Sequence, residues 1–263
     1  MSHQNSPSAN TVSNKPWRAL VTGGGKRIGA ELVRKCAEMG FAVHIHVWQS
    51  QTEAAELKAT LKNSLLHHIT LCNLENAQER AAWLKTLPAF DLIVNNASVY
   101  RLTPADGVET PEIRQRYWQV NTCAPLEIIQ SQLHHPDRHD RPLLAVNLLD
   151  CEILTPHGAI RQYHEPAPGE DSYLSTRIYL AYALQDLALK HAPQLRVNSI
   201  APGPVLPPVN CKTAGMTKIL DRVPMKKPVH TSEITAALNL FWQNPSLTGV
   251  ILPIDGGMHL IPR

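Results

Sequence analysis

The sequence lacks the features that mark secreted, disulfide-bonded and membrane-spanning proteins. Its five cysteines include no Cys-x-x-Cys pair, and the odd number favours free thiols over a disulfide framework. The first fifteen residues are polar and contain no apolar run like that of a signal peptide, and no later apolar stretch is long enough to span a bilayer. We therefore expect a cytoplasmic protein with a disordered tail over residues 1–15.

The sequence also has little excess charge. Its formal net charge is +3 and its basic residues are scattered, which disfavours a nucleic-acid-binding surface. There is no internal repeat, and with 43% hydrophobic positions the 263 residues can bury one sizeable core. We expect a single domain over residues 16–263 that binds small molecules and has neither a nucleic-acid nor a membrane partner.

Short apolar runs rich in β-branched residues alternate with longer segments of helical period, a pattern typical of βαβ units. The pattern predicts an α/β fold, a Rossmann-type doubly wound seven-stranded parallel sheet with helices on both faces. The predicted helices cover residues 31–40, 52–61, 77–87, 111–130, 173–192 and 232–242. The predicted strands are Arg18–Thr22, Phe41–Val47, His68–Leu71, Asp91–Asn95, Leu143–Leu148, Arg196–Ala201 and Val250–Ile254.

A glycine-rich stretch, TGGGKRIGA, follows the first predicted strand. Three glycines from Gly23 allow a tight turn, and Gly29 falls inside the next helix, so the backbone can approach a pyrophosphate at a helix N-terminus. The pair Lys26 and Arg27 stands where dinucleotide-binding turns usually repeat glycine. By itself the stretch also fits an ordinary strand-to-helix turn.

Five further motifs follow the turn. They are NNAS at Asn95–Ser98, Asn121 in a long helix, Tyr173 with Arg177 four positions later, APGPV at Ala201–Val205 and DGG at Asp255–Gly257. In this order the motifs resemble the short-chain dehydrogenase/reductase family from Thr22 to the C-terminus. Four details are similar to the pteridine reductases and dihydromonapterin reductases of that family: arginine in the TGxxxRIG position, serine in NNAS, Tyr100 and the ending DGGMHLIPR.

The resemblance implies a nicotinamide dinucleotide as cofactor. An NAD-selecting site carries a carboxylate at the end of the second strand, and VWQSQ offers none there, which favours NADPH. Pteridine reductases tend to have arginine in place of Gln49, so contact with the 2′-phosphate is expected from Lys26, Arg27 and Ser50. The cofactor-binding residues implied are Gly23, Lys26, Arg27, Ile28, Gln49, Ser50, Asn73, Leu74, Asn96, Ala97, Ser98, Arg177, Pro202, Gly203 and Val205.

The resemblance also implies the catalytic residues. Tyr173 is the expected proton donor, and Arg177 stands where the family has a lysine, keeping the charge without being able to relay a proton. The fifth strand ends in NLLDCE, which lacks the family's serine and places Asp150 where pteridine reductases have aspartate. A carboxylic acid bonded to the tyrosine suits protonation of a ring nitrogen. Asn121 is expected to interrupt its helix and hold a proton-relaying water.

The implied substrate is a pterin-like molecule, reduced by hydride from the nicotinamide. Arg27, Ser98, Tyr100, Asp150 and Tyr173 are the expected substrate-binding residues, with the Tyr100 ring stacked on the flat heterocycle. Two alternatives stay open. They are the reduction of another carbonyl compound and a non-catalytic NADPH-binding protein that has lost the lysine.

Four further expectations concern the rest of the chain. Tyr163 and Tyr179 are rival phenols without a basic residue four positions later, and Tyr179 is expected on a buried helical face. The segment Ile153–Asp171 is longer than the family's and is interpreted as a lid or as an insertion that displaces the catalytic pair. The resemblance implies a homotetramer formed through the long fourth and fifth helices and the last strand, with a dimer as the alternative. No metal site is expected, because His67–His68, His134–His135 and His139 lack cysteine or spaced carboxylate partners.

Overall fold

The computed structural model describes residues 16–100, 102–103, 108–138, 141–166, 172–205 and 213–261. The tail expected over residues 1–15, His139 and the end of the 153–171 segment lie outside these ranges. In the described part of the chain, every helix is too short or too polar to cross a membrane.

One parallel sheet of seven strands forms the centre of the molecule, in the order β3-β2-β1-β4-β5-β6-β7. The order reverses beside β1, which pairs with both β2 and β4, so a crevice opens at the carboxyl ends of these strands. The predicted fold class is confirmed, and each strand lies within one residue of its predicted bounds. The strands are β1 (Arg18–Thr22), β2 (Ala42–Val47), β3 (His68–Leu71), β4 (Leu92–Asn95), β5 (Leu143–Leu148), β6 (Leu195–Pro202) and β7 (Ile251–Ile254).

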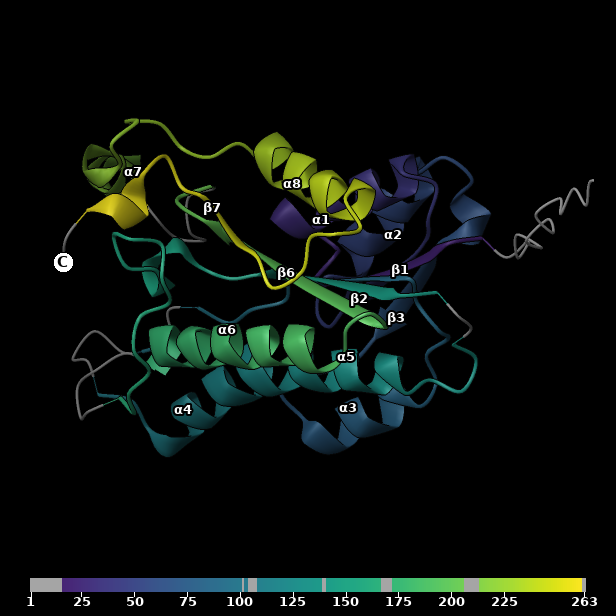
Figure 1. Cartoon of the computed structure of the whole chain (residues 1–263). Helices are drawn as coiled ribbons and strands as arrows, with labels where there is room; N and C mark the ends of the chain where they lie inside the picture. The colour runs from purple at the N-terminus through teal and green to yellow at the C-terminus, as the bar shows by residue number, and fades with distance from the viewer. Residues whose placement is uncertain are drawn as a thin grey trace, which may run out of the picture.

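Helices cover both faces of the sheet (Figure 1). Successive residues of β1 and β5 belong alternately to two apolar clusters, because successive strand residues point to opposite faces of the sheet. One cluster lies under each helical layer. One layer holds α1 (Arg27–Glu38), α2 (Gln51–Thr60) and α8 (Thr231–Gln243). The other holds α3 (Ala77–Leu84), α4 (Pro111–Trp118), α5 (Ala124–Leu133) and α6 (Ser172–Lys190).

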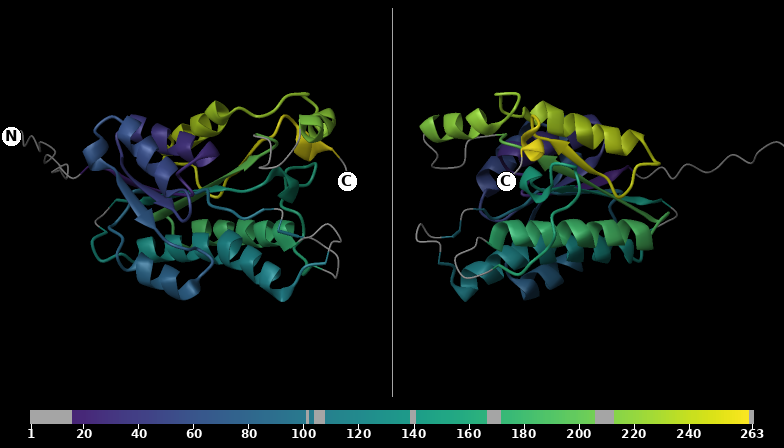
Figure 2. Two further views of the ribbon diagram at one scale, coloured as in Figure 1. Left: turned by 180° about the vertical axis from the view of Figure 1, so that it is seen from behind. Right: turned by 60° about the vertical axis from the view of Figure 1, so that its left-hand side comes forward.

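A further helix, α7 (Thr213–Arg222), is absent from the sequence-based set of helices. Figure 2 shows it at the end of the molecule, near the C-terminal 3₁₀ turn Met258–Leu260. Gly256 packs against Val223 just after α7, so the last strand and this helix are joined at their ends. This contact places α7 beside the carboxyl end of the sheet.

The long helix predicted over residues 111–130 is present but interrupted. Thr110 caps its start by accepting from the Ile113 amide at 3.4 Å, and a π-helical turn at Gln119–Cys123 separates α4 from α5. Asn121 lies in that turn, so the predicted local interruption at Asn121 is confirmed. A π turn rotates the following residues relative to a regular helix and is frequent at functional sites.

The described part of the 153–171 segment folds back on itself beside α6. Leu154 and Ile160 form an antiparallel bridge, and the Arg161 amide donates to the Ile153 carbonyl at 2.8 Å. The Tyr182 hydroxyl of α6 donates to the Ile160 carbonyl at 3.4 Å. Residues 153–161 are therefore anchored to the helix that carries Tyr173.

The expectation for Tyr179 is wrong. Its side chain is 40% exposed, and its ring makes edge contacts with Trp118 at 4.8 Å and with Tyr163 at 5.6 Å between centroids. The buried face of α6 instead carries Tyr173 and Arg177 near its start and aliphatic residues from Ile178 onward.

Candidate active site

The glycine-rich turn is packed so closely that side chains are excluded at two positions. A Cβ atom on Gly29 would lie 2.0 Å from the Gly23 carbonyl oxygen, and one on Gly25 would lie 2.7 Å from Ser50 Oγ. Asn96 Nδ2 donates to the carbonyls of Thr22 at 2.9 Å and Gly23 at 3.1 Å. The turn, the end of β2 and the loop after β4 therefore form one rigid cradle.

A cavity of about 530 Å³ opens at the carboxyl ends of the strands. Its volume is that of a typical small-molecule site. The structure thus brings together eleven of the residues expected from the sequence, contributed by five separate segments. They are Arg27, Ile28, Asn96, Ser98, Tyr100, Asp150, Tyr173, Arg177, Pro202, Gly203 and Val205.

The other expected residues lie around this cavity rather than in it. Lys26 lines a second cavity of about 480 Å³ between α1 and α2, together with Arg34 and Glu53. The remaining residues are Gln49 and Ser50 at the end of β2, Asn73 and Leu74 after β3, Gly23 and Ala97 in the cradle, and buried Asn121.

The centre of the main cavity is a hydrogen bond between Tyr173 and Asp150. The Tyr173 hydroxyl donates to Asp150 Oδ2 at 3.1 Å, while Asp150 Oδ1 accepts from the Glu152 amide at 2.9 Å. Burial, followed by the neighbouring carboxylate, raises the pKa of Tyr173 well above its ordinary value, and Arg177 opposes this shift. Burial also raises the pKa of Asp150. Both groups therefore favour their protonated forms relative to the same groups in water.

Arg177 lies one helical turn after Tyr173 and is 4% exposed. Its Nη1 donates to the Leu148 carbonyl at 3.3 Å, and its guanidinium carbon lies 5.5 Å from the centre of the Tyr173 ring. Its Nε is buried and has no hydrogen-bond partner among the described residues. A buried donor without a partner is costly, so this nitrogen is suited to a ligand oxygen.

Tyr100 lines the cavity beside Tyr173. Its side chain is 51% exposed, and its ring meets the Tyr173 ring at 60° with 4.7 Å between centroids. The exposed face of an aromatic ring at a cavity can stack on a flat ligand.

Asn121 is fully buried behind the loop after β4. Its Oδ1 accepts from the Val99 amide at 3.0 Å and from Ser98 Oγ at 3.2 Å, and its Nδ2 donates to the Val99 carbonyl at 3.0 Å. These bonds fix the loop that carries Ser98 and Tyr100. The proton relay through Asn121 stays a prediction.

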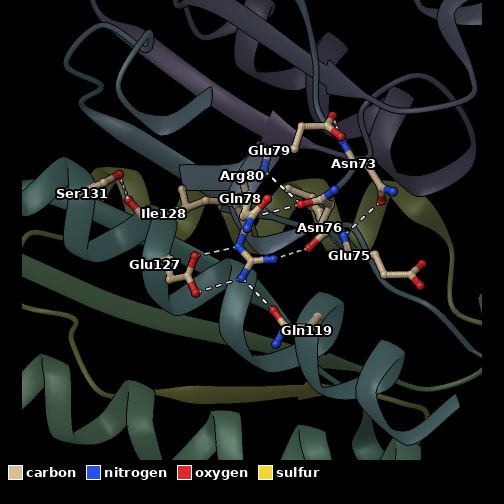
Figure 3. A network of polar contacts seen from close by, with 11 residues as sticks. Asn73, Glu75, Asn76, Gln78, Glu79, Arg80, Gln119, Glu127, Ile128 and Ser131 are labelled. Carbon is tan, nitrogen blue, oxygen red and sulfur yellow. Dashed lines mark hydrogen bonds and ion pairs between the residues drawn. The ribbon is translucent and has the colours of Figure 1, made fainter. Parts of the chain in front are cut away.

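A buried arginine connects the loop after β3 to the π turn (Figure 3). Arg80 is 0% exposed and pairs with both carboxylate oxygens of Glu127, at 2.6 and 2.9 Å. It also donates to the Leu74 carbonyl and, at 2.8 Å, to Gln119 Oε1 in the π turn. Nothing local in the sequence indicates this role, because Arg80 is one of several charged residues on an ordinary helix.

Sequence reasoning also missed several residues of the main cavity. Cys151 and Glu152 follow Asp150 directly, and a search for groups around that aspartate would have found them. Ile219 and Arg222 come from α7, which was not predicted, and Met258 follows the DGG motif. Their position depends on how the C-terminal part of the chain folds back over the sheet.

Comparison with known proteins agrees with this architecture. The model of the family described as enoyl-(acyl carrier protein) reductase matches residues 24–259. L-xylulose reductase of Mesocricetus auratus is 28% identical over 247 residues, covering 91% of this chain and 95% of that protein. Carbonyl reductase (NADPH) 2 of Sus scrofa is 26% identical and covers the same shares.

A solved structure is also similar. FolM alternative dihydrofolate reductase 1 from Brucella suis, in complex with NADP, superimposes with a TM-score of 0.80 at 27% identity, covering 94% of this chain and 96% of that one. The matched family model spans most of the chain and includes six of the seven strands, Tyr173 and Asp150. The chain therefore belongs to the short-chain dehydrogenase/reductase family of NAD(P)-dependent oxidoreductases.

Proposed function

We propose that this protein is an NADPH-dependent reductase of pteridines, acting on dihydropterin, dihydromonapterin or dihydrofolate-like substrates. The hydrogen bond between Tyr173 and Asp150 carries the proposal. The family's carbonyl reductases place a serine hydroxyl at the end of this strand, whereas here the partly buried carboxyl group of Asp150 occupies the position. The likeness to a dihydrofolate reductase of the same family supports it.

The residues present fit a nicotinamide dinucleotide. Arg27 at the start of α1 lines both cavities, so the N-terminus of this helix is open to a pyrophosphate, and the unpartnered Nε of Arg177 offers a donor to a ribose hydroxyl. We expect Asn73 and Leu74 to border the adenine ring. When bound, the dinucleotide supplies the hydride for the reduction.

The protein itself binds and orients the substrate. Tyr100 and Tyr173 provide an aromatic corner for a flat bicyclic ring, and Ser98 and Arg27 offer polar groups to its edge. A ring held against an aromatic side chain gains on the order of 1 kcal/mol beyond simple burial.

Tyr173 and Asp150 deliver the proton. The raised pKa of Tyr173 keeps its hydroxyl protonated near neutral pH, so Oη can give a proton to the ring nitrogen beside the carbon that is reduced. Asp150, whose pKa is also raised, lies within hydrogen-bond distance to return a proton to Oη. Arg177 stabilises the phenolate formed between the two transfers.

The test measures NADPH oxidation by wild-type protein against dihydrobiopterin, dihydromonapterin, dihydrofolate, L-xylulose and simple ketones. We expect kcat/KM for a pteridine to exceed that for every carbonyl compound by about tenfold or more. A second candidate function, carbonyl reduction, is favoured by the names of the L-xylulose and carbonyl reductases. A higher kcat/KM for a sugar or ketone than for any pteridine would establish it instead.

A further inference from the structure

A buried glutamate joins the two segments that form the aromatic wall of the cavity. The Glu109 side chain is 0% exposed. Its Oε1 accepts from Thr103 Oγ1 at 2.7 Å and from the Ser172 amide at 3.0 Å, and its Oε2 accepts from Ser172 Oγ. Thr103 belongs to the loop that carries Tyr100, and Ser172 is the first residue of α6.

A buried tyrosine holds the same loop from the other side. Tyr117 of α4 is 0% exposed, and its hydroxyl oxygen accepts from the Leu102 amide at 2.8 Å and the Thr103 amide at 3.4 Å. Its ring centre lies 6.1 Å from that of Tyr173. The loop is therefore fixed both to α4 and, through Glu109, to the start of α6.

These contacts bear directly on the cavity. Ser172 immediately precedes Tyr173, and the Tyr100 ring lies 4.7 Å from the Tyr173 ring. Thr103 follows Tyr100 closely in the chain, so a shift of this loop relative to α6 changes the distance between the two rings. A carboxylate at the N-terminus of a helix is also favoured by the helix dipole, which explains why a buried charge is tolerated there.

We infer that Glu109 is a positioning residue that sets the spacing of Tyr100 and Tyr173 and thereby the fit of a flat ring in the cavity. Arg114 Nε lies 3.7 Å from Glu109 Oε2 and provides the nearest positive charge, without a hydrogen bond. The inference rests on the proposed function only for the choice of substrate.

Two substitutions at Glu109 separate positioning from charge. Glu109→Ala removes every acceptor and leaves Thr103 and the first turn of α6 without their partner. Glu109→Gln loses the charge but keeps an oxygen for Thr103 and the Ser172 amide, and its amide group can donate to Ser172 Oγ. Glu112→Ala is the matched control, because Glu112 is exposed in the first turn of the neighbouring helix α4.

The experiment combines kinetics with amide hydrogen exchange followed by mass spectrometry. We expect Glu109→Ala to raise the KM for the best pteridine about tenfold or more, with kcat changing by less than about threefold and the Kd for NADPH unchanged. Exchange should accelerate in the peptides that contain Leu102, Thr103 and Ser172. Glu109→Gln should restore KM to within about threefold of wild type, and Glu112→Ala should resemble wild type in both measurements.

A double-mutant cycle identifies the route of the effect. If Glu109 acts through Tyr100, the rise in KM caused by Glu109→Ala should largely disappear in a Tyr100→Ala background. Faster exchange without a change in KM, or equal effects in both backgrounds, would overturn the inference. Unchanged hydrogen exchange in Glu109→Ala would also overturn the inference, whichever substrate the protein reduces. Absence of pteridine turnover by the wild type would instead count against the proposed function, and KM would then be measured for the compound that is reduced.

Discussion

The Tyr173 hydroxyl donates to Asp150 Oδ2 at 3.1 Å, and the two side chains come from segments 23 residues apart. Burial raises the pKa of each group. The Asp150 carboxylate raises the pKa of Tyr173 further, whereas the hydrogen bond from Tyr173 lowers that of Asp150. The cation of Arg177 lowers the pKa of both groups. The site therefore holds a proton between two oxygens, beside a fixed positive charge.

Loss of the phenol tests the proton donor. Tyr173→Phe keeps the ring and its contact with Tyr100 but removes the hydroxyl, so turnover should fall about 10²-fold or more while the Kd for NADPH changes little. Steady-state kinetics and fluorescence titration of NADPH measure the two quantities. Unchanged turnover would mean that another group donates the proton, and Tyr163 would be the next residue to substitute.

Asp150 should make stability depend on pH above the ordinary pKa of an aspartate. Because burial raises the pKa of Asp150, the folded state binds a proton more tightly than the unfolded state does, and protonation therefore stabilises the fold. This stabilisation is lost as the pH rises through the raised pKa. Asp150→Asn carries no charge, so it should unfold at higher urea concentration than wild type at neutral pH, while reducing pteridines more slowly. Asp137→Asn, at an exposed position, is the control.

The arginine in place of the family's lysine gives a third prediction. Arg177→Lys keeps a cation beside Tyr173 and supplies a compact ammonium group, so turnover should stay within about threefold of wild type or rise. Arg177→Met removes the charge and should lower turnover about tenfold or more, because the phenolate loses its stabilising cation. Equal turnover in the lysine and methionine variants would contradict a role for the charge. If only Arg177→Lys turns over any substrate, the natural protein is a binding protein.

Cofactor preference follows from the end of β2. Residues 48–50 are Trp-Gln-Ser and offer no carboxylate to ribose hydroxyls, while Lys26 lies at the start of α1. NADPH should therefore bind about tenfold or more tightly than NADH, a difference of about 1.4 kcal/mol. Lys26→Gln should reduce this ratio, whereas Lys190→Gln, at the exposed C-terminal end of α6, should not. Equal affinities for both dinucleotides in calorimetric titration would contradict the prediction.

A buried histidine beneath the cradle should make the protein sensitive to acid. His46 Nδ1 accepts from the Gly23 amide at 3.3 Å and its Nε2 donates to the Cys72 carbonyl at 3.0 Å, so the ring is bonded in its neutral form. Burial lowers its pKa from 6.5 to about 4. The neutral His46 ring therefore contributes its full stabilisation above pH 6.5. As the pH falls toward 4, the free energy of unfolding decreases by about 3 kcal/mol.

Urea unfolding at several pH values measures this effect. His46→Gln should show a shallower fall in the free energy of unfolding between pH 6.5 and 4 than wild type, although its stability at pH 7 will be lower. His134→Gln, at an exposed position, should keep the wild-type slope. The same slope in all three proteins would show that protonation of His46 does not govern acid unfolding.

The sequence by itself determined the sheet and the identity of much of the site. Nearly continuous apolar runs such as Leu143–Leu148 are fully buried strands, and their bounds can be read because both faces of a parallel sheet need apolar residues. The glycines at 25 and 29 signal close packing through their lack of a side chain. The roles of the site residues and the tetrameric state stay predictions.

Only the tertiary structure decided how these residues meet. The Tyr100 to Tyr173 contact, the clamp at Glu109 and the links made by Arg80 each join segments far apart in the chain, and nothing local distinguishes a clamping glutamate from a solvated one. Helix α7 and exposed Tyr179 escaped prediction for the same reason. Local periodicity records which residues avoid water, whereas the partner of each polar group depends on the packing of the whole chain.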